Sequence, residues 1–327
     1  MGIRKEKKKI FAGILILFVS LAYGFFKLYT TPATNHPEPI KISVIQANIP
    51  QDLKWQESAR DFIIRKYLGF NTVAASARPD LLIWPEAALP VVLEEEPEYY
   101  RLLINNVRQI KTPLLFGAVT QSKGLYYNSA CLVSGEGQFL ERYDKIHLVP
   151  FGEYIPLKKA LPFLETIVPI GDITPGRQYS IFEVPNSKVP NKFSVLICFE
   201  DLFPELSREF VRRGASFLAN ITNDAWYKKT SAAAQHFQAS VFRAVENRVY
   251  LVRAANTGIS GFIAPSGRIV SLVRDSSGST IFIDGITTQV IPIERHGPTF
   301  YGEKGDFFIL LLLLFVIYGI SRKFKNV

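Results

Sequence analysis

The chain has 327 residues, 48% of them hydrophobic and 20% charged, which suits one large domain or two ordinary ones and excludes overall disorder. The formal net charge is +9, but the two ends carry +7 of it, in residues 4–9 and 322–325. The +2 that remains over the rest of the sequence provides no basic face, so we expect no nucleic acid partner.

The first predicted element is a membrane anchor within residues 1–30. Ile10 to Phe26 is an uncharged apolar run, which at ~1.5 Å per residue nearly spans a ~30 Å hydrocarbon core. A cleaved signal peptide is the alternative, but no suitable small-residue cleavage site follows the run. Residues 31–40 (TPATNHPEPI) then form a Pro-rich linker.

Residues 41–295 alternate between short apolar runs and amphipathic stretches, which predicts an α/β domain with a mixed sheet. The long segment at 145–176 contains five prolines and is expected to be a functional loop or a lid. Strands are expected at 41–47, 80–84, 114–119, 126–133, 139–143, 193–198, 216–221, 250–254, 259–264 and 268–273, and helices at 56–77, 98–110, 204–213 and 232–248.

The last predicted elements are a transmembrane helix at 305–321 and a basic cytoplasmic tail at 322–327. Phe307 to Ser321 is an unbroken apolar run without a polar face, which favours a membrane span over its alternative, a buried helix. Both apolar runs carry their positive charges on the terminal side. The positive-inside rule therefore places both termini in the cytoplasm and the domain between them outside.

Two cysteines are too few for a disulfide-rich scaffold or a cysteine-based zinc site, and the four histidines lack metal-ligand spacing. We therefore expect no metal. Cys198 ends an apolar strand, at a turn that can expose a nucleophile and aim backbone N–H groups at one point. The alternative is a buried, inert thiol, and that interpretation is favoured for Cys131, which lies inside a hairpin strand.

Three charged residues in other segments could serve such a thiol. Glu86 ends an apolar strand, Lys145 follows a hairpin strand, and Glu153 opens the Pro-rich loop. Taken singly, each is equally well a capping, surface or loop residue. Together they supply a carboxylate to accept the thiol proton, an ammonium to stabilise a tetrahedral oxyanion, and a second carboxylate to hold that ammonium.

Three segments, in the order WPEAALP, RYDKIHLVPFGEYIP and LICFEDLFP, resemble the carbon–nitrogen hydrolase (nitrilase) superfamily. Within that superfamily, the chain most resembles the apolipoprotein N-acyltransferases. The further matching segments are QANIPQDLKW (46–55), ITNDAW (221–226), QHFQ (235–238), RAVENR (243–248) and AANTGIS (254–260). The resemblance covers about residues 41–275 and the C-terminal apolar run.

The resemblance implies the αββα sandwich of nitrilases, here with one N-terminal and one C-terminal transmembrane helix. It also implies that Glu86 is the general base, Lys145 the oxyanion stabiliser and Cys198 the nucleophile. The supporting residues that it implies are Glu153, Glu200 and Phe199, and the substrate-binding residues are Trp55, Asn223 and Trp226.

The implied reaction is acyl transfer without a cofactor. Cys198 takes an acyl chain from a membrane glycerophospholipid as a thioester, and the α-amino group of a diacylglyceryl-cysteine apolipoprotein receives it. The implied location is the bacterial inner membrane, with the catalytic domain on the periplasmic or outer face.

The chain departs from the family pattern in two ways. It has one apolar run before the domain where the family has a bundle of membrane helices, so a separate membrane subunit could supply the rest. Phe199 stands where the family commonly has tyrosine. The alternative functions are a membrane-tethered amidase with the same Glu-Lys-Cys triad and water as acceptor, an inactive binding subunit, and a cysteine–histidine hydrolase that uses His147 or His236.

Overall fold

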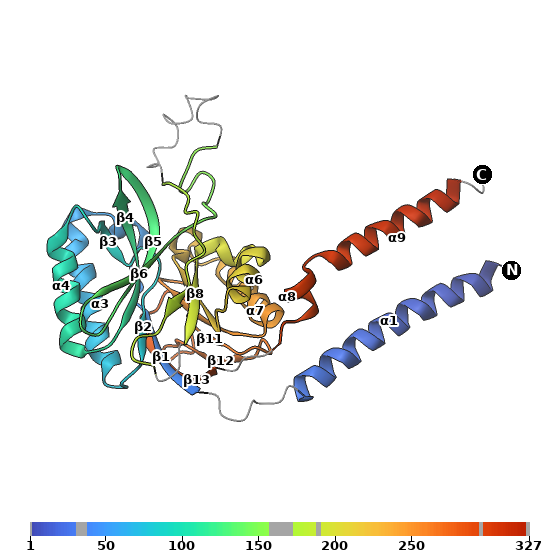
Figure 1. Ribbon diagram of the computed structural model, residues 1–327, viewed down its shortest axis with the longest axis horizontal. Coiled ribbons are helices and arrows are strands. Elements are labelled where there is room, and N and C mark those ends of the chain that lie inside the picture. Colours follow the sequence, from blue (N-terminus) through green and yellow to red (C-terminus); the bar gives the residue numbers. More distant parts are fainter. Residues whose placement is uncertain (1, 31–37, 157–172, 188–190, 294–296, 325–327) are drawn as a thin grey trace. The chain divides into compact units, whose positions relative to one another are not determined.

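The computed structural model describes residues 2–30, 38–156, 173–187, 191–293 and 297–324 (Figure 1). The chain divides into two compact units, Met1–Pro37 and Glu38–Val327. The first unit contains the helix α1 (Gly2–Thr30). The second contains the α/β domain, the short helix α8 (Phe300–Lys304) and the final helix α9 (Phe307–Phe324).

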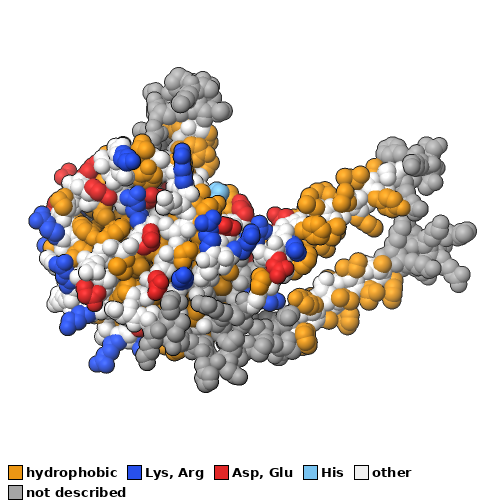
Figure 2. Space-filling view, in the orientation of Figure 1, with side chains coloured by type: hydrophobic (Ala, Val, Ile, Leu, Met, Phe, Trp, Pro, Cys, Tyr) orange, Lys and Arg blue, Asp and Glu red, His pale blue; other side chains and the backbone are white. Residues whose placement is uncertain are grey.

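Apolar side chains gather along the central parts of α1 and α9 (Figure 2). The large apolar side chains between Ile10 and Phe26 and between Phe307 and Ile320 are 46% to 75% exposed. Within the described ranges, no helix combines the length and the apolar character needed to cross a membrane, so the two predicted spans are not confirmed.

Two sheets form the α/β domain. The strand order is β13-β1-β2-β4-β5-β6 in the first sheet, where β3 also pairs with β4, and β12-β11-β10-β9-β8-β7 in the second. The first sheet contains β1 (Glu38–Gln46), β2 (Leu81–Ile83), β3 (Leu89–Val92), β4 (Leu114–Ser122), β5 (Leu125–Val133), β6 (Phe139–Asp144) and β13 (Gly285–Ile293). The second contains β7 (Phe182–Glu183), β8 (Lys192–Ile197), β9 (Phe217–Thr222), β10 (Tyr250–Ala255), β11 (Gly261–Ile263) and β12 (Ile269–Leu272).

The two sheets face each other, and each has helices on its outer side (Figure 1). The first sheet is covered by α3 (Arg60–Ala75) and α4 (Pro97–Ile110). The second is covered by α6 (Pro204–Arg212) and α7 (Ala232–Asn247). This order of layers is the αββα sandwich that the family resemblance implied.

Alternation along the strands explains why their sequences are almost continuously apolar. Successive side chains of a strand point to opposite faces of its sheet. In β4, Leu115 belongs to the core between the two sheets, whereas Leu114 and Phe116 belong to the core beneath α3 and α4. Because both faces are covered, neither face of the strand needs polar side chains.

The observed elements differ from the predicted ones in a few places. The expected helix at 56–77 is a 3₁₀ turn, η1 (Glu57–Ala59), followed by α3. β1 begins at Glu38, inside the expected linker, and pairs with β13, a strand that was not predicted. Of the expected loop at 145–176, residues 157–172 lie outside the described residues, so its interpretation as a lid stays a prediction.

Candidate active site

Strand ends from both sheets meet at a cavity of about 340 Å³. Glu86, Lys145, Cys198 and Asn223 follow β2, β6, β8 and β9 within one to three residues, and all four line the cavity. The carboxyl ends of parallel strands share one edge of a sheet, where α/β proteins commonly place their ligands. The predicted residues Glu153, Trp55 and Trp226 also line the cavity, whereas Glu200 and Phe199 do not.

Cys198 lies at a sharp turn between β8 and the short 3₁₀ helix η2 (Cys198–Leu202). The backbone φ of Cys198 is 54°, in the left-handed region that residues other than glycine seldom adopt. The side chain of Asn220 donates to the Cys198 carbonyl at 3.0 Å and holds this turn. Burial raises the pKa of the thiol and the negative charge of Glu86 raises it further, while Lys145 opposes both. The resting thiol is therefore protonated and needs a proton acceptor before it can act as a nucleophile.

Glu86 is held by groups from three other segments. Its Oε1 accepts from Asn128 Nδ2 at 2.7 Å and from Lys145 Nζ at 3.3 Å, and its Oε2 accepts from the backbone N–H of Asn223 at 2.9 Å. Burial by itself would raise the pKa of Glu86, but the charges of Lys145 and Lys54 hold it below its ordinary value. Glu86 is therefore an ionised carboxylate that lines the same cavity as the thiol.

The side chain of Lys145 is 1% exposed and lies between the carboxylates of Glu86 and Glu153. The distance from Lys145 Nζ to Glu153 Oε2 is 2.9 Å. Burial would lower the pKa of Lys145, but the negative charges of Glu86 and Glu153 raise it, so the ammonium stays charged. Asn128 also donates to Glu153 Oε1 at 2.7 Å. This arrangement of thiol, carboxylate and ammonium can support acyl transfer through a thioester.

Asn128 was not identified from the sequence, although it joins the two carboxylates. It lies in β5, and it is 8% exposed. A buried amide in a strand needs hydrogen-bond partners. The position of Asn128 within the run YYNSACLV could therefore have indicated that its side chain binds other polar groups.

Glu200 lies outside the cavity and connects two segments that lead to it. Its Oε1 accepts from the backbone N–H groups of Ile146 and His147, at 2.7 and 3.0 Å, and from the Tyr143 hydroxyl at 2.8 Å. Its Oε2 accepts from the N–H of Ile197 at 2.8 Å. Burial raises the pKa of Glu200 to about 7 in spite of these donors. The carboxyl group thus ties the segment after Lys145 to the strand before Cys198.

The predicted substrate-binding residues differ in exposure. Trp55 and Trp226 are 48% and 66% exposed, so they present apolar rings to solvent at the cavity. Asn223 is buried, and its side chain donates to Gln51 Oε1 at 2.8 Å. Phe199, predicted as a supporting residue, packs its ring against His236, with 5.0 Å between the centroids.

A buried group of charged residues lies behind the Cys198 turn. Arg253 Nη1 donates to Asp201 Oδ2 at 2.9 Å, and its Nη2 donates to Asp224 Oδ2 at 3.2 Å. His236 contacts the same two aspartates at 2.9 and 2.8 Å, and its Nε2 lies 3.2 Å from the Cys198 carbonyl oxygen. Burial and Arg253 oppose the charge on His236, but the two aspartates hold the pKa of His236 above its ordinary value. Sequence analysis missed this group, although Arg253 within the apolar strand YLVRAA implied a buried partner.

Neither histidine of the cysteine–histidine alternative lines the cavity. His236 belongs to the buried charged group, and the ring of His147 stacks on Phe203 with 4.2 Å between centroids. Within the described parts of the chain, no group of His, Cys, Asp and Glu side chains is arranged to hold a metal ion.

Arg253→Met is expected to lower the free energy of unfolding by about 3–5 kcal/mol, because it leaves two buried aspartates without their cation. The matched control is Arg101→Met on the exposed side of α4, where a change within about 0.5 kcal/mol is expected. Urea unfolding followed by circular dichroism measures both. Equal stability of the two variants would show that Arg253 does not support the Cys198 turn.

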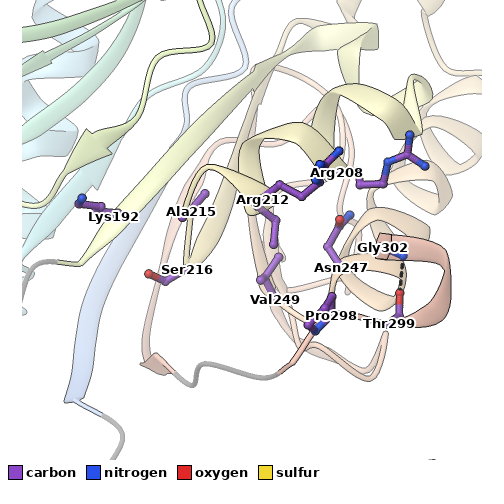
Figure 3. A pocket seen from close by; sticks show the side chains of 12 residues that line it. Lys192, Arg208, Arg212, Ala215, Ser216, Asn247, Val249, Pro298, Thr299 and Gly302 are labelled. Atoms are coloured by element: carbon purple, nitrogen blue, oxygen red, sulfur yellow. Dashed lines mark hydrogen bonds between the residues drawn. The ribbon is translucent and has the colours of Figure 1, made fainter. Parts of the chain in front are cut away.

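A second cavity, of about 550 Å³, lies where β8 begins, between α6 and α8 (Figure 3). Its basic lining residues are Lys192, Arg208 and Arg212, and Thr299 accepts there from the N–H of Gly302 at 2.8 Å. The lining contains no cysteine, histidine or carboxylate side chain. The smaller cavity, with the thiol, is therefore the candidate active site.

Comparison with known proteins relates the chain to one family. The family profile of carbon–nitrogen hydrolases matches residues 41–291. The chain is 40% identical over 307 residues to an apolipoprotein N-acyltransferase of Geobacter metallireducens and 35% identical over 321 residues to one of Rickettsia typhi. These matches cover 92% and 96% of the chain but 56% and 61% of the two relatives, so the chain spans little more than half their length. They confirm the resemblance predicted from the sequence motifs.

Solved structures share the fold. An amidase from Nesterenkonia sp. superposes with a TM-score of 0.59 at 18% identity, over 84% of this chain and 96% of the amidase. A mutant of the Nesterenkonia sp. AN1 amidase, with the acetamide moiety of fluoroacetamide added covalently at its active site cysteine, gives a TM-score of 0.57 at 19% identity. That match covers 77% of this chain and 90% of the mutant amidase. At these identities the likeness concerns the fold alone.

Proposed function

Because the chain belongs to the carbon–nitrogen hydrolase family, we propose that it is an apolipoprotein N-acyltransferase. In this proposal, an acyl chain moves from a membrane glycerophospholipid to Cys198 and then to the α-amino group of a diacylglyceryl-cysteine apolipoprotein. The names of the relatives support this assignment. The observation that carries it is the meeting of the Cys198 thiol, the Glu86 carboxylate and the Lys145 ammonium in one cavity.

The first half-reaction forms a thioester. Glu86 takes the proton from the Cys198 thiol, and the thiolate attacks the carbonyl carbon of the donor ester. Lys145 stabilises the negative charge that develops on the carbonyl oxygen, while Glu153 holds the ammonium in place. The bond between the carbonyl carbon and the ester oxygen then breaks. The lysophospholipid alcohol leaves with the proton that Glu86 returns.

The second half-reaction releases the acyl chain to the amine. The α-amino nitrogen of the acceptor attacks the thioester carbon, and Glu86 takes a proton from that nitrogen. The bond between carbon and sulfur breaks, and Glu86 returns the proton to the thiolate. The products are an amide and the free thiol. Donor product leaves before the acceptor reacts, so the kinetics are ping-pong.

The exposed rings of Trp55 and Trp226 suit the substrates of this reaction. Both residues line the cavity and present apolar surface to solvent, where an acyl chain would otherwise meet water. Asn223 contributes its backbone N–H to Glu86 and so keeps the general base oriented toward the cavity. On these grounds we assign Trp55 and Trp226 to substrate binding. Asn223, which the family resemblance groups with them, lines the same cavity and positions Glu86.

We further propose that the domain works at the outer face of a bacterial inner membrane, held there by α1 and α9. The exposed apolar side chains of the two helices support an environment other than water. The basic residues on the terminal sides of both apolar runs support cytoplasmic termini. In this proposal residues 41–295 form the catalytic domain.

The expected result of the direct test is a covalent thioester that forms without any lipoprotein. Purified protein is mixed with a phospholipid in detergent and its intact mass is recorded. A gain of one fatty acyl group, removed by hydroxylamine, is expected because the ping-pong scheme stores the acyl chain on Cys198. A diacylglyceryl peptide added next should become N-acylated. If lysophospholipid appears only together with free fatty acid, even with this peptide present, water is the acceptor and the protein is a hydrolase.

A further inference from the structure

A second lysine lines the candidate active site and has no role in the reaction described above. Lys54 is the last residue of α2 (Gln51–Lys54), it is 2% exposed, and it shares the cavity with Glu86 and Cys198. Its Nζ donates to the backbone carbonyl oxygen of Glu86 at 3.0 Å. This hydrogen bond orients the ammonium and uses one of its three N–H groups.

The two lysines of the cavity differ in their partners. Lys145 lies within 3.3 Å of two carboxylates. Among the described residues, no carboxylate oxygen pairs with Lys54, which donates to a neutral backbone carbonyl instead. Burial lowers the pKa of Lys54 to about 8, against the charge of Glu86, so most molecules still carry the ammonium at pH 7. Lys54 makes no ion pair of its own and shares the charge of Glu86 with Lys145, so an anion that enters the cavity would stabilise its buried ammonium further.

The donor of the proposed reaction brings such an anion. A glycerophospholipid carries a phosphodiester a few bonds from the ester that Cys198 attacks, and an ammonium binds phosphate as a point charge. Lys54 and Lys145 are the cationic side chains of the cavity lining, and Lys145 is already occupied by Glu86 and Glu153. We propose that Lys54 binds the phosphodiester of the acyl donor and thereby selects donors that carry a phosphate. This inference rests on the proposed acyltransferase function.

The test compares two acyl donors in the same detergent, a phosphatidylglycerol and a p-nitrophenyl ester of the same fatty acid. Acylation of Cys198 is followed by intact mass for the unchanged protein and for Lys54→Met, which keeps most of the length of the side chain and removes its charge. We expect the half-saturating concentration of phosphatidylglycerol to rise ~10- to 100-fold, the loss of one charge-assisted hydrogen bond. At a pH where Glu86 is ionised in both proteins, acylation by the neutral ester should change less than about threefold, and Lys54→Arg should restore part of the phospholipid preference.

Each other outcome has a defined meaning. Equal losses with both donors would overturn the phosphate assignment and make Lys54 an oxyanion stabiliser or a support for the Glu86 backbone. No loss with either donor would overturn it as well. Inorganic phosphate that protects Cys198 from the neutral ester only when Lys54 is present would assign the residue to free phosphate instead of a lipid. Unchanged protein that reacts with the neutral ester but never with phospholipid would refute the acyltransferase function itself.

A second variant serves as the control for loss of folding. Should Lys54→Met not fold, Lys54→Gln keeps an N–H group for the Glu86 carbonyl and removes the charge alone. Acylation of Cys198 by phosphatidylglycerol is then compared with acylation by the neutral ester in that variant. Acylation by the neutral ester shows that the thiol site is intact.

Discussion

Cys198→Ser is expected to abolish the acylated form of the protein, lowering acyl transfer by at least about 10³-fold. A serine hydroxyl is a much weaker acid than a thiol, so Glu86 cannot activate it in the same position. Intact mass after incubation with phospholipid, and N-acylation of a diacylglyceryl peptide, measure the effect. The loss should occur without unfolding, because serine differs from cysteine by one atom and fits the same turn between β8 and η2.

Cys131→Ser is the matched control and should retain most of the activity. Both cysteines are free and buried, but Cys131 lies within β5 and does not line the cavity. Burial also raises the pKa of the Cys131 thiol, which keeps it protonated and inert. An equal loss of activity in both serine variants, with the fold retained, would contradict a mechanism that uses Cys198 alone.

Lys145→Ala is expected to slow acyl-enzyme formation by ~10²–10³-fold, the typical effect of losing one group that stabilises an oxyanion. The charge of Lys145 is also the strongest of those that hold the pKa of Glu86 down. Its removal should therefore raise the pKa of Glu86. Since the reaction needs Glu86 ionised, activity should now be lost at a higher pH as the solution is made acidic. Rates of acylation measured across pH report both effects.

Lys66→Ala supplies the control for a lost lysine. Its ammonium pairs with Asp284 at 2.9 Å near the surface, where an ion pair contributes little, so both the rate and its pH dependence should stay unchanged. A Lys145→Ala protein that is slow but keeps the original pH profile would mean that Lys145 does not control the pKa of Glu86, and would leave oxyanion stabilisation as its role.

The residues that meet in the cavity could be predicted from the sequence because charged and nucleophilic side chains follow the ends of its apolar strands. Glu86, Lys145 and Cys198 each interrupt such a pattern, and the family resemblance supplied their order. Their supports were harder to find. Asn128 and Arg253 reach partners from distant segments, and only the packing of two sheets brings those partners together.

The fold shows the same division between local and distant information. The amphipathic helices at 97–110 and 232–247 were predicted to within one residue at each end, because their apolar periodicity is local. The strand β13 was missed. It pairs with β1 across more than 200 residues, and Pro292 within it suits the edge position that it occupies.

Glu200 gives the domain an unusual sensitivity. It belongs to the turn after one sheet, yet its carboxyl group holds the segment that follows a strand of the other. The reacting groups are likewise divided between the two halves of the sandwich, so sliding one half by ~1 Å would cost ~10²-fold in rate. Hydrophobic replacements between the halves can therefore leave a soluble, well-folded protein that has lost its chemistry. For anyone screening variants of this domain, expression yield and melting temperature are poor substitutes for an assay of the thiol.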